Sequence, residues 1–103
     1  MAITFKEFQS KAEQVEIHPE RTDQPWIYAL TGLTEASGKF SKTLEAGLPN
    51  GELTPEERGK AIECAWKLLW SLTVACNLAG ISLEEAAERG LSEMDHLGDH
   101  LLP

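Results

Sequence analysis

Apolar side chains recur at helical spacing in four segments of the chain. In the first segment they are Phe5, Phe8, Ala12 and Val15. Thr4 precedes this run, and Glu7 follows three residues later, which is the pattern of a helix-capping box. We therefore expect a helix that begins after Thr4 and ends before His18 and Pro19. The polar segment that follows, HPERTDQP, is bracketed by prolines and is expected to be a loop.

A second helix is expected from about Trp26 to Ala46. Its apolar positions with helical spacing are Ile27, Leu30, Leu33 and Leu44. Gly47 and Pro49 come directly after it, and both residue types are typical of the end of a helix. The next residues, LPNGEL, are expected to form a turn.

The third helix has the strongest start signal in the chain, because Thr54 is followed by Pro55 and then by Glu57 in the capping-box position. Gly80 ends it after Leu78 or Ala79. Its apolar stripe contains Ile62, Ala65, Trp66, Leu69, Leu72 and Cys76, and Leu68, Trp70 and Ala75 widen it. A helix that is apolar on most sides is expected to be buried on most sides.

Ser82 and Glu85 open a fourth helix, which we expect Gly90 to interrupt. No segment alternates in the manner of a strand, so the expected class is all-α. We expect a bundle of three long helices and a shorter C-terminal helix. A chain of 103 residues can build one hydrophobic core and hardly two, which predicts a single domain over residues 1–103.

Charge and composition exclude some classes of function. The formal charge of −8 argues against a groove for a nucleic-acid polymer, which needs clustered positive charge. An acidic protein can still bind nucleoside triphosphates when its carboxylates hold Mg²⁺. No apolar run is long enough for a membrane span, and the segment MAITFKEFQSK lacks the apolar centre of a signal peptide. We expect a cytoplasmic protein with two buried thiols at Cys64 and Cys76, which one helix holds too far apart for a disulfide.

The order of the segments resembles the MazG-like, all-α nucleoside triphosphate pyrophosphohydrolases over roughly residues 3 to 94. The segments that carry the resemblance are FKEFQSKAEQ, IYALTGLTEASGKFSKTLEAG and IECAWKLLWSLTVACNLAGISLEEAAERGL. Members typically have a glycine-leucine step, an ExxE motif, an ExxD motif and a closing phrase like GISLEE. The resemblance implies a homo-oligomer, either a dimer or a tetramer, whose carboxylates hold Mg²⁺ and which releases pyrophosphate from a nucleotide.

The chain departs from this pattern at two of the four expected ligand positions. Glu35 opens the first motif, but Gly38 stands at its second carboxylate position. Glu63 opens the second motif, but Trp66 stands where an aspartate is expected. Glu35 and Glu63 are therefore the candidate catalytic and metal-binding residues, either as a half-site for one Mg²⁺ that Glu45 or water completes, or as relics at a helix interface. A size exchange that packs Trp66 against Gly38 would turn the former site into core.

Other residues are candidates for nucleotide binding. Lys39 and Lys42 could meet the phosphates, and Lys42 matches a lysine that the family often has after its first motif. The alternative is that both are solvated surface lysines. Trp26, Tyr28, Trp66 and Trp70 could stack on a base, and the alternative for these aromatic residues is a place in the core or in a subunit interface.

The sequence leaves three functions open. The first is a member of the pyrophosphohydrolase fold that has lost catalysis and keeps a binding or regulatory role, which Gly38 and Trp66 favour. The second is a working Mg²⁺-dependent hydrolase with a rebuilt site. The third is a helical module for protein–protein interaction, in which the resemblance reflects the fold alone.

Overall fold

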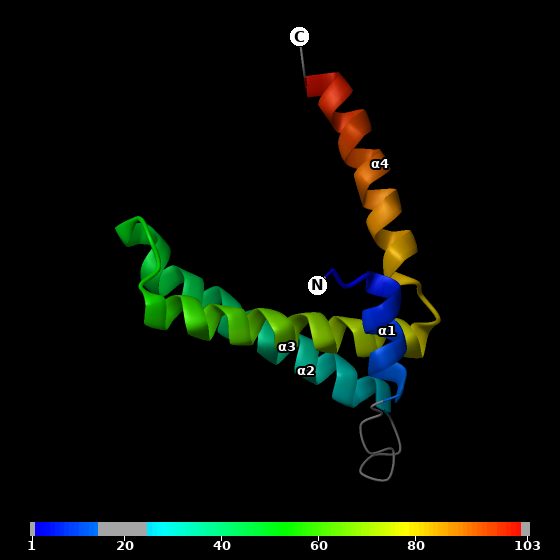
Figure 1. Cartoon of the computed structure of the whole chain (residues 1–103), viewed down its shortest axis with the longest axis horizontal. Coiled ribbons are helices and arrows are strands. Elements are labelled where there is room, and N and C mark those ends of the chain that lie inside the picture. The colour runs from blue at the N-terminus through cyan, green and yellow to red at the C-terminus, as the bar shows by residue number, and fades with distance from the viewer. Residues whose placement is uncertain (1, 15–24, 102–103) are drawn as a thin grey trace.

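The computed structural model describes residues 2–14 and 25–101, and these residues form helices with no strand among them. The elements are α1 (Phe5–Gln14), α2 (Pro25–Gly47), the short 3₁₀ helix η2 (Leu48–Asn50), α3 (Pro55–Ala79) and α4 (Leu83–Leu101). Figure 1 shows α2 and α3 side by side, α1 across the C-terminal half of α3, and α4 leading away from the rest. The all-α class is confirmed.

Local capping signals define the starts of α1 and α3 as the sequence predicts. The Glu7 amide donates a hydrogen bond to Thr4 Oγ1 at 3.0 Å. At the start of α3 the capping box is complete: the Glu57 amide donates to Thr54 Oγ1 at 3.1 Å, and the Thr54 amide donates to Glu57 Oε1 at 2.8 Å. Each bond satisfies a backbone or side-chain group that the first helical turn leaves without an intrahelical partner.

Gly80 ends α3 and turns the chain into α4. Its φ of 71° lies in the left-handed region, where a residue with a Cβ is strained. The following amide, of Ile81, donates to the Cys76 carbonyl at 2.9 Å. The axes of α3 and α4 differ by 105°. The expectation that Gly90 interrupts α4 was wrong, because the helix continues through it; a single internal glycine costs only about 1 kcal/mol relative to alanine.

The α2–α3 pair is antiparallel, as the paired positions along it show. Ser71 lies beside Gly32, where an added Cβ would come within 3.2 Å of the serine Oγ. Thr43 Oγ1 and Cys64 Sγ are 3.9 Å apart further along the two helices. Small side chains therefore let the helices approach closely. Both cysteines are free, and Cys76 is buried as expected, whereas Cys64 is only partly buried.

Gln9 of α1 joins three parts of the chain at the corner between α3 and α4. Its side-chain amide donates to the Ile81 carbonyl at 2.7 Å, and its Oε1 accepts from the Leu83 amide at 3.0 Å. Its backbone carbonyl accepts from Asn77 Nδ2 at 3.3 Å. One side chain thus holds α1 against the point where α4 departs.

Few side chains are buried. Among the described residues they are Ala12, Ala29, Ala61, Thr73, Cys76 and Leu83. The expectation that the third helix is buried on most sides was wrong for a single chain, since Ile62, Trp66 and Leu72 of α3 are exposed. The reason is that α2 covers one side of α3, and α1 covers only the C-terminal part of another (Figure 1).

The arrangement also differs from a bundle of three long helices with a shorter last one. The shortest α-helix is α1, with 10 described residues, whereas α4 has 19. The Cα radius of gyration is 16.6 Å, but a compact chain of 103 residues would have about 13 Å. Among the described helices, none is by itself long and apolar enough to cross a lipid bilayer.

Candidate functional site

The two candidate carboxylates are each held by a lysine one turn further along the same helix. Glu35 Oε1 on α2 is 3.7 Å from Lys39 Nζ. Glu63 Oε1 on α3 is 3.2 Å from Lys67 Nζ. Residues four apart lie on the same side of a helix, so the sequence spacing alone produces both pairs. All four side chains are exposed, and such pairs contribute only about 0–1 kcal/mol to stability.

The expected packing of Trp66 against Gly38 was wrong. An added Cβ at Gly38 would meet nothing within 4 Å, so no side chain of the described residues fills the space beside it. Trp66 is 52% exposed. Its ring is 5.9 Å from Lys67 Nζ, which favours a weak cation–π interaction. The two replaced ligand positions therefore lie at the surface of this chain and are not part of its core.

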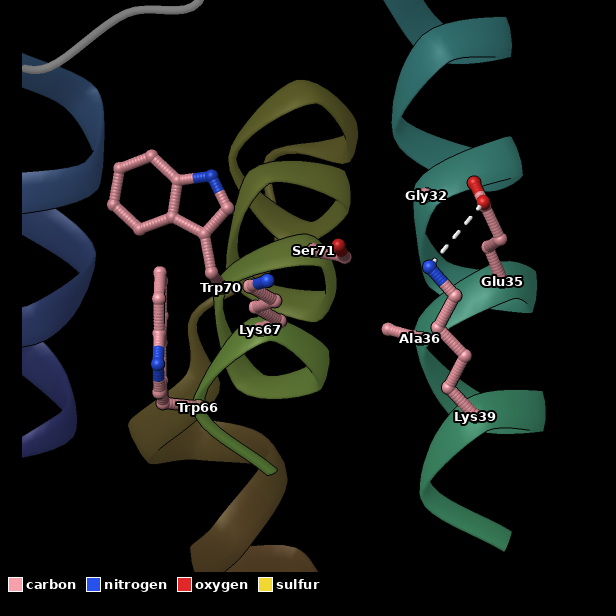
Figure 2. Close-up of a pocket in the computed structure, with 8 residues that line it drawn as sticks. All are labelled: Gly32, Glu35, Ala36, Lys39, Trp66, Lys67, Trp70 and Ser71. Carbon is pink, nitrogen blue, oxygen red and sulfur yellow. Dashed lines mark ion pairs between the residues drawn. The ribbon is translucent and has the colours of Figure 1, made fainter. Parts of the chain in front are cut away.

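A surface hollow of about 470 Å³ lies along the seam between α2 and α3. Figure 2 shows its lining, and the two indole rings lie on the side of α3 that faces away from α2. The lining residues are Gly32, Glu35, Ala36, Lys39, Trp66, Lys67, Trp70 and Ser71. Trp70 is positioned by the ring of Phe8 in α1, which meets it edge-on at 6.4 Å. The hollow thus combines two aromatic faces with two ammonium groups and one carboxylate.

A smaller hollow of about 200 Å³ extends the first one along the same seam, with Gly32, Glu35, Trp70 and Ser71 lining both. Its further lining residues are Tyr28, Ala29, Thr31 and Val74. The charged side chains Lys39 and Lys67 line only the larger hollow, whereas Tyr28 lines only the smaller one. Both lysine ammonium groups therefore lie at one end of the seam, whereas aromatic side chains line both hollows.

The described side chains do not fit a two-ion magnesium centre. Nowhere in this part of the chain do three or more His, Cys, Asp or Glu side chains gather in a way that could hold a metal ion. Glu35 is the only carboxylate that lines either hollow, and Glu63 lines neither. Two-ion phosphoryl chemistry needs several oxygen ligands arranged around both ions. A half-site for one Mg²⁺ at Glu35 and Glu63 stays a prediction.

The structure places some of the other predicted residues in the two hollows and leaves one of them outside. Lys39, Trp66 and Trp70 line the larger hollow and Tyr28 the smaller one, whereas Lys42 is exposed on α2 outside both linings.

Sequence reasoning missed the other lining residues of the two hollows, among them Lys67, Gly32 and Ser71. Lys67 could have been found from its position four residues after Glu63. Gly32 and Ser71 could have been found as small residues inside long apolar helices, which indicate close helix approach.

No protein-family model, no curated protein and no solved structure matches this chain.

Proposed function

We propose that this chain is a MazG-like helical protein that has lost pyrophosphohydrolase catalysis and acts as a nucleotide-binding or regulatory subunit of a cytoplasmic homo-oligomer. One observation carries the proposal: positions 38 and 66, where the resembling enzymes place carboxylates, offer an open surface and an indole ring. An indole has no oxygen ligand for Mg²⁺, and a glycine has no side chain at all.

The ion pairs of Glu35 and Glu63 do not by themselves explain the proposed loss of catalysis. Exposed pairs of this kind break at a cost of about 1 kcal/mol or less, so a bound Mg²⁺ could displace either lysine. The missing second carboxylate on each helix is the larger defect. Without it no pair of ions can clamp the attacking water and the leaving pyrophosphate together.

The hollow supports a binding role without a metal. The faces of Trp66 and Trp70 are large aromatic surfaces of the kind on which a nucleotide base stacks. Lys39 and Lys67 can pair with phosphate oxygens by exchanging their carboxylate partners, which are exposed. The net charge of −8 favours a small nucleotide over a nucleic-acid polymer. The two free thiols fit a reducing compartment.

The test of lost catalysis is pyrophosphate release from a panel of nucleoside and deoxynucleoside triphosphates with Mg²⁺ or Mn²⁺. We expect no release above the buffer rate. Release that the Glu35→Ala variant abolishes would overturn the proposal and favour a working hydrolase with a rebuilt site. The double variant Gly38→Glu, Trp66→Asp restores the expected four carboxylates, and both positions are exposed enough to accept them.

The same nucleotide panel tests binding when chelator replaces the metal. We expect a nucleotide to raise the thermal midpoint, because a ligand that binds only the folded state stabilises it. Lys39→Ala should weaken this effect. The control is Lys60→Ala, since Lys60 also pairs with a glutamate one turn away, at 3.9 Å from Glu56, but lies outside both hollows. No shift with any nucleotide would contradict the binding role.

A further inference from the structure

The helix α4 extends away from the other described helices (Figure 1). Its first residue, Leu83, is only 6% exposed, and the Leu83 amide donates to Gln9 of α1. About two to four turns further on, Leu91, Met94 and Leu97 are 59%, 60% and 55% exposed. These three are among the most exposed large apolar side chains of the described residues. The apolar side of α4 is therefore buried where the helix begins and open further along.

The apolar residues of α4 share one side of the helix. At 100° per residue, the apolar and small residues from Leu83 to Leu97 fall within an arc of about 140°, and the charged residues lie outside it. We call this arc the α4 stripe, and it consists of Leu83, Ala86, Ala87, Gly90, Leu91, Met94 and Leu97. Because the buried Leu83 belongs to it, the stripe continues the interior of the molecule onto an open helix.

Carboxylates border the α4 stripe on both sides. At 100° per residue, Glu93 lies about 20° beyond one edge, and Glu84 lies about 20° beyond the other. Between Leu83 and Leu97 the chain has five carboxylates and one guanidinium, that of Arg89, so this stretch contributes −4 to the total charge of −8. The carboxylates are all on exposed residues, namely Glu84, Glu85, Glu88, Glu93 and Asp95. The stripe is therefore an apolar surface inside an acidic border.

A surface hollow of about 570 Å³ lies at the α3–α4 corner and follows one edge of the stripe. Its lining residues are Gly80, Ile81, Ser82, Glu85, Ala86, Arg89, Gly90 and Glu93. Ala86 and Gly90 belong to the stripe, and an added Cβ at Gly90 would meet nothing within 4 Å. The hollow can therefore accept a long basic side chain, whose apolar stem lies on Ala86 while its charged end pairs with Glu85 or Glu93.

We propose that the α4 stripe is a docking surface for a basic amphipathic helix of another protein. The apolar side of the partner helix packs on Leu91, Met94 and Leu97, and its lysine or arginine side chains meet the carboxylates of both borders. Charge decides between the occupants. A second copy of this chain brings carboxylates against carboxylates, and an anionic membrane surface or a nucleic-acid polymer is repelled as well. The inference goes beyond the proposed function and does not depend on nucleotide binding.

The experiment titrates the full chain with a synthetic peptide of about 18 leucine and lysine residues, whose leucines recur at helical spacing. We expect a dissociation constant of roughly 1–50 μM by calorimetry. A peptide of the same composition in scrambled order should bind at least about 10-fold more weakly, because it presents no apolar side. Equal binding of the two peptides, or no binding of either, would overturn the proposal.

Variants of the stripe show whether the peptide binds at α4. Leu91→Gln and Met94→Gln should each weaken binding by about 5–10-fold, because each removes apolar surface from the contact. The control is Leu48→Gln, since Leu48 is 53% exposed and lies in η2, before the start of α3, whereas α4 follows its end. All three substitutions change exposed residues, so circular dichroism should show an intact fold. A control that weakens binding as much as the stripe variants would contradict docking at α4.

A second set of variants separates the acidic border from the total charge. Glu88→Gln together with Glu93→Gln removes one carboxylate from each border and should weaken binding by about 10-fold in about 0.05 M NaCl. Glu13→Gln together with Glu52→Gln removes the same charge from exposed residues of α1 and of the turn before α3, and should change binding by less than about 2-fold. Equal effects of the two double variants would mean that the charge of the whole chain attracts the peptide, and would overturn the proposal.

Sedimentation of the chain alone tests a second copy as the occupant. We expect Leu91→Gln to leave the mass unchanged, whatever assembly the wild type forms. A loss of mass would assign the stripe to a contact between subunits, and binding to phosphatidylcholine vesicles that Leu91→Gln abolishes would assign it to lipid; either result would overturn the proposal. Failure of the proposed function is recognised separately: a chain that binds the peptide but no nucleotide keeps the docking surface, whereas one that binds nucleotide but not the peptide refutes the docking surface alone.

Discussion

Gly38 and Gly47 are the same residue type in the same helix, but their surroundings are opposite. An added Cβ at Gly38 would meet no atom within 4 Å. One at Gly47 would come within 2.5 Å of Leu53 Cδ2 and 2.8 Å of Glu57 Oε1. The second contact matters most, because that carboxylate accepts the Thr54 amide in the capping box of α3.

Alanine at these two positions should therefore change stability in opposite directions. Gly38→Ala is expected to raise the free energy of unfolding by about 0.5–1 kcal/mol, since alanine favours the helix. Gly47→Ala is expected to lower it by about 1–3 kcal/mol, through overpacking and a disturbed cap. Urea unfolding of the two variants measures both. A stabilised Gly47→Ala would show that Leu53 and Glu57 move aside without loss.

At the scale of elements, α1 owes its place to a few specific contacts. Gln9 supplies the polar ones, at the corner where α4 begins. Thr73, which is fully buried in α3, satisfies its own hydroxyl by donating to the Leu69 carbonyl at 2.7 Å and makes no polar link to α1. Gln9 thus supports the corner that the turn at Gly80 makes between α3 and α4.

Gln9→Ala should loosen this corner. The Leu83 amide and the Ile81 carbonyl would both lose their side-chain partner, at a cost of about 1–3 kcal/mol in unfolding free energy. Hydrogen exchange at the Leu83 amide should accelerate. Gln14→Ala serves as the control, because Gln14 ends α1 as an exposed residue. Equal exchange rates in the two variants would mean that apolar contacts alone fix α4.

The sequence predicted those features that depend on neighbours along the chain. The caps at Thr4 and Thr54 and the stop at Gly80 were found because their partners lie within four residues. The relation of Gly38 to Trp66 was not, because it depends on how α2 is rotated against α3, which no local signal fixes. The apolar stripe of α3 indicated that this side of the helix favours burial, but it did not indicate which element or partner would bury it.

At the scale of the whole molecule, the charge of −8 opposes the homo-oligomer of the proposed function. Two copies carry like charges, so electrostatic repulsion works against the apolar contacts that would join them. Salt screens repulsion between exposed charges but leaves apolar contacts in place.

Raising the salt concentration from about 0.05 M to about 0.5 M NaCl should therefore tighten the proposed homo-oligomer by a few-fold. Sedimentation equilibrium at the two salt concentrations measures the change in dissociation constant. An assembly that weakens with added salt would indicate ion pairs between its subunits and would contradict an interface of apolar contacts.

The bonds of Gln9 also bear on how the protein is made. The glutamine and its partners in the α3–α4 corner are 72 and 74 residues apart in the chain. The α2–α3 pair, by contrast, is connected by a short turn and can form as soon as both helices have left the ribosome. During synthesis α1 emerges before the other described helices and yet has no docking place until α3 and the start of α4 have followed. Of the described helices, the earliest made is therefore the last to be placed, and a stop in translation before α4 leaves its apolar side exposed to chaperones and proteases.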